Sequence, residues 1–150
     1  MKQEISYKDV ENMLYSFNSI KAAVVDIQIE IDSINNNYIG IIGAGENDIR
    51  PTSPTNAFNS NVESEVINKE RCIEKLERVK RAKQLQVDRI ENMLTTLRED
   101  ERELVAYKYF KKYSLNRIAG ILDLSYETVK TNKRLIISSL ANFLNEKQNQ

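Results

Sequence analysis

The sequence contains no histidine, no tryptophan and a single cysteine, and these absences remove several classes of site. Without histidine and with one thiol, neither a Cys/His zinc site nor a Ser-His-Asp or Cys-His catalytic set can form. Cys72 has no second cysteine to pair with, which fits a reducing compartment. Carboxylates are plentiful, but they lie on stretches expected to be solvated helices, with no sign of convergence. We therefore expect no enzyme, with no catalytic residues, no metal and no cofactor.

Helix breakers and long apolar runs are also scarce. The chain has only four glycines and two prolines, and most of its length is free of both, which favours an all-α fold. No stretch of about 18 apolar residues exists that could span a membrane. Residues 1–12 also lack the apolar core of a signal peptide. We therefore expect a cytoplasmic protein that does not associate with membranes.

A long amphipathic helix is predicted near the start of the chain. Its apolar residues recur at steps of three and four, as on one helix face: Tyr7, Val10, Leu14, Phe17, Ile20, Val24, Ile27, Ile31 and Ile34. Ser6 and Asp9 suit an N-terminal cap, and the poor helix formers Asn35–Asn37 should end the helix. Residues 38–61 hold three of the four glycines and both prolines, so they are predicted to be a linker.

A second long helix is predicted over residues 62–97, again with apolar positions at steps of three and four. Lys80 and Lys83 fall on this apolar seam. The middle of the seam is therefore either wet or shifted onto Val79 and Ala82. Two helices of similar length joined by a loop fold most simply as an antiparallel hairpin, here with a coiled-coil-like seam.

Residues 114–134 have the pattern of a helix-turn-helix. Small Ala119 suits a close crossing of two helices, and Leu124 in the turn is placed to fill the space between them. Ser125 suits the N-cap of the second helix, because its hydroxyl can accept from backbone N–H groups of the first turn. The apolar face of the two helices is expected to comprise Ile118, Ala119, Leu122, Val129, Leu135, Ile136 and Leu140.

A C-terminal domain of three helices follows from this pattern. Asp100 is a candidate cap for the first of them, and the tail after residue 145 should be frayed. The three helices are expected over about residues 101–111, 114–122 and 126–145. We place the domain boundary between a helical hairpin of residues 1–98 and a helix-turn-helix domain of residues 99–150.

The net charge of zero hides an asymmetry along the chain. Residues 1–65 hold 4 basic and 10 acidic side chains, whereas residues 66–150 hold 18 and 12. Within residues 108–134 the count is 7 basic against 2 acidic. A polyanion responds to the local field within a Debye length of roughly 8–10 Å, so neutrality of the whole chain does not argue against nucleic-acid binding.

The predicted outward face of the helix-turn-helix is suited to double-stranded DNA. Side chains near the start of the second helix are candidate readers of base edges in the major groove: Tyr126, Glu127, Lys130, Thr131, Asn132 and Arg134. Other cations are candidates for phosphate contacts: Lys108, Lys111, Lys112, Arg117 and Lys133. The alternative for each residue is a solvated helix face, and for the whole domain a three-helix bundle that contacts protein.

The C-terminal third resembles the helix-turn-helix of sigma factor region four, which reads the −35 promoter element. The matching residues are Thr96–Arg102, Tyr109–Phe110, Ser114, Ile118–Ala119, Leu122–Ser125 and Thr128–Lys130. Tyr126 stands where sigma factors commonly carry arginine, so their promoter preference does not transfer. No other sigma region is present, and the chain alone should not melt promoters.

The whole chain is similar to phage-encoded transcriptional regulators of the ArpU and RinA kind. Those have a helical N-terminal region with an insertion rich in Gly, Pro, Ser and Thr, here Gly43–Thr55, before a sigma-like module. The resemblance implies regulation of phage or prophage genes through helix 126–139, with RNA polymerase as a possible partner. The long helices suggest a homo-oligomer, with a dimer the simplest case, because helix-turn-helix proteins usually need two half-sites.

The sequence also contains one loop motif and allows one competing function. Gly40–Glu46 resembles a nucleotide loop, but it lacks the Lys-Ser/Thr of a P-loop and follows no strand. The competing function is the DNA-recognition (small) subunit of a phage packaging terminase, or another DNA-binding assembly protein. Such subunits also join a helix-turn-helix to long helices, although commonly with the DNA module first.

Overall fold

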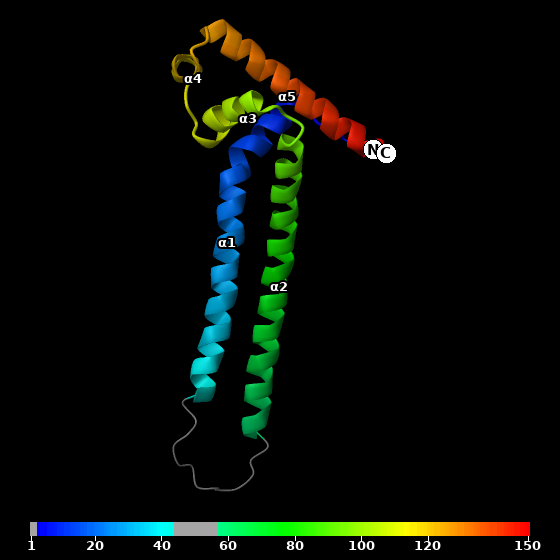
Figure 1. Cartoon of the computed structure of the whole chain (residues 1–150). Helices are drawn as coiled ribbons and strands as arrows, with labels where there is room; N and C mark the ends of the chain where they lie inside the picture. The colour runs from blue at the N-terminus through cyan, green and yellow to red at the C-terminus, as the bar shows by residue number, and fades with distance from the viewer. Residues whose placement is uncertain (1–2, 44–56) are drawn as a thin grey trace. The chain divides into compact units, whose positions relative to one another are not determined.

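The computed structural model describes residues 3–43 and 57–150, and the side chains of residues 3–37 and 62–150. All regular structure in these ranges is helical (Figure 1), which confirms the all-α prediction. None of the described helices is both long and apolar enough to cross a bilayer. The elements are α1 (Tyr7–Gly43), α2 (Ala57–Leu94), α3 (Glu99–Val105), η1 (Ala106–Phe110), α4 (Leu115–Leu122) and α5 (Tyr126–Gln148).

The predicted ends of the long helices need correction. Asn35–Asn37 do not end α1, which continues to Gly43, and α2 already begins at Ala57. An asparagine costs a helix only about 0.7 kcal/mol relative to alanine, and Ile34 is half-buried beside a hollow that it lines together with residues of α2. The rest of the predicted linker, residues 44–56, lies outside the described residues.

The start of α3 and the C-terminal tail also differ from prediction. Asp100 is not the cap, because the chain is extended at Arg98 and its backbone N–H donates to the Glu101 carboxylate at 2.9 Å. After α3 the chain forms the π-helical turn η1, which no sequence pattern predicted. The tail is not frayed from residue 146, since α5 extends to Gln148.

The chain divides into two compact units, and the boundary is not at residue 98. The first unit combines residues 1–21 with residues 85–150, and the second consists of residues 22–84. The division differs from the predicted one because one end of each long helix packs with the C-terminal helices.

The first unit is built around a dense apolar core. Its members come from all six elements, and the most fully buried are Val10, Leu14, Ile90, Met93, Val105, Tyr109, Ile118, Val129, Ile137 and Leu140. The Ser6–Asp9 cap is confirmed: the Ser6 backbone N–H donates to Asp9 Oδ2 at 2.9 Å and the Asp9 N–H donates to Ser6 Oγ at 3.3 Å. These bonds fix the start of α1, which supplies part of the core.

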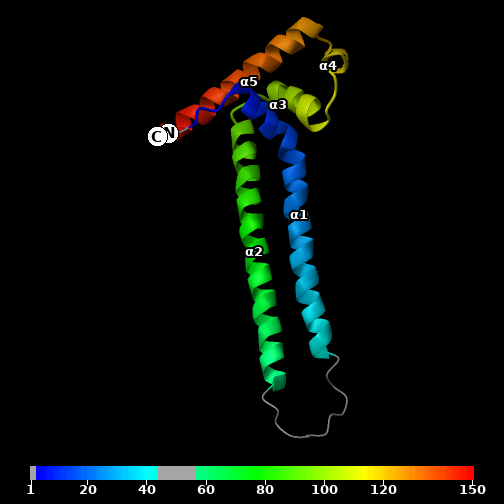
Figure 2. The ribbon, with the colours of Figure 1, turned by 180° about the vertical axis from the view of Figure 1, so that it is seen from behind.

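The second unit is an antiparallel hairpin in which α1 and α2 lie side by side (Figures 1 and 2). Of its described side chains, Ile31 alone is buried. Lys80 and Lys83 are half-buried on the seam, whereas Val79 and Ala82 are exposed, so the seam is wet rather than shifted. Lys80 Nζ donates to Gln28 Oε1 of α1 at 2.5 Å, which gives the half-buried ammonium an acceptor inside the seam.

Candidate nucleic-acid interface

The helix-turn-helix forms from two capped helices and a tight turn. Ser114 Oγ accepts from the Arg117 backbone N–H at 3.3 Å and caps α4. Asp123 ends α4 in the left-handed region at φ 54°, and the N–H of Leu124 donates to Ala119 O at 3.0 Å. Ser125 Oγ accepts from the Thr128 N–H at 3.1 Å, which confirms the predicted cap of α5.

Most of the predicted apolar face lies in the core, but Leu135 of that face and Leu124 of the turn do not. Ile118, Ala119 and Val129 are buried where α4 and α5 pack. Leu124 does not fill the space between the helices, because the left-handed residue before it turns the chain outward and leaves it exposed. Leu135 is 59% exposed, since one residue is about 100° of helical rotation and it points away from Ile136.

Four of the candidate base readers share one exposed face at the start of α5. Lys130, Thr131 and Arg134 follow Glu127 by three, four and seven residues, and the four side chains line one open hollow of about 560 Å³. Tyr126, the first residue of α5, is exposed beside them. The arrangement places charged and hydroxyl groups at the N-terminal half of a helix whose first N–H groups carry a partial positive charge.

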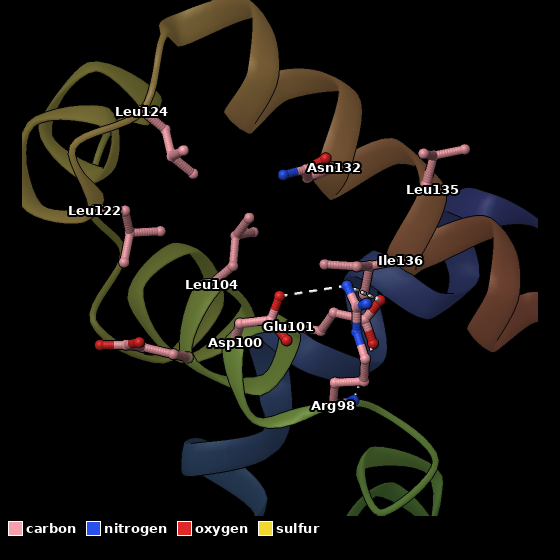
Figure 3. Close-up of a pocket in the computed structure, with 10 residues that line it drawn as sticks. Arg98, Asp100, Glu101, Leu104, Leu122, Leu124, Asn132, Leu135 and Ile136 are labelled. Atoms are coloured by element: carbon pink, nitrogen blue, oxygen red, sulfur yellow. Dashed lines mark hydrogen bonds and ion pairs between the residues drawn. The ribbon is translucent and has the colours of Figure 1, made fainter.

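Asn132, another predicted base reader, does not lie on this face. It lies about 140° around the helix from Glu127 and about 160° from Lys130. It lines a second hollow of about 290 Å³ (Figure 3), together with Leu104 of α3 and Leu124 of the turn. The rim of this hollow is mainly acidic: Asp100, Glu101 and Glu103, with Arg98 paired to Asp100 at 3.3 Å. Carboxylates repel phosphates, so this side of the unit is unsuited to DNA.

Lys133 lines the same hollow as Glu127 and Arg134, but its ammonium is paired with a carboxylate. Its Nζ lies 3.3 Å from Glu11 Oε1, and the two side chains are only 19% and 21% exposed. Burial alone lowers the pKa of Lys133, but Tyr7 and Glu11 outweigh it and raise the pKa. Glu11 Oε1 also accepts from the Tyr109 hydroxyl at 2.7 Å, and burial first and this bond second raise the pKa of Tyr109. The predicted phosphate-binding cation is therefore already neutralised by α1.

The start of α1 contributes residues that the sequence pattern did not place in the site. Tyr7 lines the same hollow as Glu127 and Thr131. The segment before it is attached to α5, because Ile5 N donates to Asn145 Oδ1 at 2.8 Å and Asn145 Nδ2 donates to Ile5 O at 3.0 Å. No pattern in the sequence links positions so far apart.

The remaining predicted phosphate contacts lie around the η1–α4 connection. Lys108 is half-buried, whereas Lys111, Lys112 and Arg117 are exposed. A cation–aromatic stack orders two of them: the rings of Tyr107 and Tyr113 are stacked 5.9 Å apart, and the Arg117 guanidinium lies 3.8 Å from the Tyr113 ring centroid. Lys111 Nζ lies 4.8 Å from the Tyr107 ring centroid. Such contacts restrict long cationic side chains and leave their polar ends accessible.

Comparison with known proteins agrees with this geometry. Residues 88–137 match the family described as Sigma-70, region 4. Neither a curated protein nor a solved structure matches the chain. The matched segment begins within α2, in agreement with the first unit, and ends within α5. The chain therefore carries a DNA-binding helix-turn-helix of the sigma region-four kind.

Proposed function

We propose that this protein is a sequence-specific transcriptional regulator that reads the major groove of double-stranded DNA with the first half of α5. One observation carries the proposal: Glu127, Lys130, Thr131 and Arg134 converge on one exposed face of the helix that Ser125 caps. In helix-turn-helix proteins this half of the second helix addresses base edges. The role is one of binding without catalysis, in the cytoplasm.

The proposed division of labour follows the geometry. Tyr126, Glu127, Lys130, Thr131 and Arg134 read bases. A second set holds phosphates: Lys108, Lys111, Lys112 and Arg117. Asn132 and Lys133 are left out of both sets, because one lines the acidic-rimmed hollow and the other is paired with Glu11.

Measured affinities for a cognate site and for random DNA test this division. The cognate site is first selected from a random DNA pool. Glu127→Ala and Thr131→Ala should each cost on the order of 1–3 kcal/mol on the cognate site and little on random DNA. Lys112→Ala and Arg117→Ala should weaken both nearly equally and lower the salt slope by about one unit each.

Asn132→Ala is the matched control, since it alters the same helix on the other side. It should leave both affinities unchanged. Equal losses on cognate and random DNA for Glu127→Ala and Thr131→Ala would show that a different face enters the groove.

The likeness to ArpU and RinA regulators supports phage or prophage genes as the target. It depends on the order of a long helical region, an insertion and a sigma-like module, and most of the insertion lies outside the described residues. RNA polymerase is the proposed protein partner. The acidic-rimmed hollow is the candidate surface, because its apolar floor suits protein and its charge does not suit DNA. Leu135→Ser should weaken co-binding of polymerase on a promoter without changing affinity for DNA alone.

The alternative is the DNA-recognition subunit of a phage packaging terminase or another DNA-binding assembly protein. The hairpin attached to a helix-turn-helix fits this function as well. The mass of the native assembly discriminates: a closed ring of eight or more copies favours packaging, and a dimer favours regulation. We propose a homo-oligomer formed through the long helices.

A further inference from the structure

Within the second unit, α1 has apolar residues on two opposite faces. The face toward α2 carries Val24, Ile27 and Ile31, which are half-buried or buried. Val25 and Ile29 are each 60% exposed, and Ile29 lies about 160° around the helix from Ile31. With Ala22 they form what we call the back face of α1. Isolated exposed apolar residues are ordinary, but a helix with two apolar faces is usually covered on both.

Within residues 22–37, every charged side chain that flanks the back face is acidic. Asp26, Glu30 and Asp32 lie around it, and residues 22–37 contain no lysine or arginine. A partner for this face therefore needs exposed apolar groups next to basic ones.

The other helix of the same hairpin offers such a surface. Arg71, Lys75 and Arg78 are exposed and follow one another at steps of four and three, so they form a single row along α2. Cys72 and Val79, both exposed, lie beside this row. We call these five residues the basic flank of α2. Arg78 is paired with Glu74 at 2.6 Å, but both side chains are more than half exposed, so the pair can exchange partners at little cost.

We propose that the hairpin binds a second copy of this chain, with the back face of α1 against the basic flank of α2 in the other copy. Pairing two back faces would bring six carboxylates together, and pairing two basic flanks would bring six cations together. The mixed pairing joins opposite charges and covers Val25 and Ile29. The inference assigns the contact surfaces of the proposed homo-oligomer and is independent of whether the first unit binds DNA.

Sedimentation equilibrium of the full chain is the first test. The native protein should self-associate, and the double variant Val25→Ser with Ile29→Ser should raise the apparent dissociation constant about tenfold or more. Val62→Ser is the matched control, since Val62 is also exposed on α2 but lies nine residues before Arg71, the first residue of the basic flank. It should have no effect. A monomeric native chain would overturn the proposal and leave the back face to a different protein.

The second test reverses the charges on each side of the proposed interface and leaves its apolar residues unchanged. Lys75→Glu with Arg78→Glu should weaken self-association, as should Asp26→Lys with Glu30→Lys. All four changes in one chain should restore it, because every charge pair across the interface is reversed. Failure of the combined variant to recover would overturn the mixed pairing. Circular dichroism and affinity for a single DNA half-site should be unchanged throughout, which separates this result from a failure of DNA binding.

The single cysteine provides a third test. In the variant Ile29→Cys, oxidation should link the introduced thiol of one copy to Cys72 of the other and yield a covalent dimer under denaturing, non-reducing conditions. The variant Val62→Cys should yield far less. Equal yields from the two variants would overturn the assigned face.

Discussion

The two units of this chain use the same two long helices differently. In the first unit, the ends of α1 and α2 pack against α3, α4 and α5, and every buried apolar side chain that the structure describes lies there except Ile31. In the second unit, two half-buried lysines lie in the seam, and Val25 and Ile29 face outward. The same apolar periodicity thus builds a core where α3, α4 and α5 pack against the long helices. Where those helices are absent, it gives only a narrow contact between α1 and α2.

This difference shows where stability and association reside. The first unit carries the helix-turn-helix on a core that α1 helps to complete, so the recognition helix is held by residues from both ends of the chain. The second unit leaves apolar surface for a partner. We expect mutations to affect folding in the first unit and self-association in the second.

Removing the long helices altogether should have the largest effect. The fragment 99–150 lacks Val10, Leu14, Ile90 and Met93, which are almost completely buried against the C-terminal helices. It should therefore show no cooperative thermal unfolding and no specific DNA binding. A chain in which a short Gly/Ser linker replaces residues 22–84 should retain both. Cooperative unfolding of the fragment 99–150, measured by circular dichroism, would contradict the boundary described here.

Truncation of a single apolar side chain should have the second-largest effect, and its cost in unfolding free energy should differ between the two units. Leu14 is fully buried in the first unit, so Leu14→Ala should lower the free energy of unfolding by about 2–5 kcal/mol in urea titrations. Ile27, on the hairpin seam, is only half-buried. Ile27→Ala should cost about 1 kcal/mol, since less apolar area is lost. Similar losses for the two variants would show that the hairpin core is better packed than its burial indicates.

Loss of the Glu11 contacts should have the third-largest effect on the free energy of unfolding. Glu11→Gln removes the charge that pairs with Lys133 and leaves Tyr109 a neutral amide oxygen as acceptor, so it should cost on the order of 1–2 kcal/mol. It should also raise affinity for random DNA, because Lys133 is no longer neutralised. Glu91→Gln is the control: its pair with Lys21, at 3.0 Å, is half exposed and should contribute less than about 1 kcal/mol. An unchanged affinity for random DNA would mean that Lys133 cannot reach the duplex.

The cap of α1 should give the smallest effect, visible as a pH dependence. The Ser6 hydroxyl first, and its backbone N–H second, lower the pKa of Asp9 below its ordinary 3.8. The stabilisation is therefore present above pH 3.8 and is lost as the pH falls through the lowered pKa. Asp9→Asn should slightly lower the melting temperature at neutral pH and flatten its decrease below about pH 4. A parallel acid dependence in the two proteins would exclude this cap as a contributor.

Local features of the helix-turn-helix were predictable from the sequence. Ser125 caps α5 because its hydroxyl accepts from a free backbone N–H of the first turn, and Val129 and Ile118 are buried as their spacing indicates. The face of Glu127, Thr131 and Arg134 follows from the helical period alone. Asn132 was misplaced because the prediction took all polar residues of the segment together, without separating positions about 140–160° apart.

The tertiary structure decided everything that depends on distant partners. Glu11 and Lys133 are 122 residues apart in the chain, and Ile5 and Asn145 are 140 apart, so no local period can pair them. The outward turn of Leu124 depends on a left-handed backbone at Asp123, which a non-glycine residue adopts only in a favourable local setting. Helix type and capping are local and are encoded by neighbouring residues. The membership of each unit is decided by which apolar faces meet, and that is set only when the chain folds.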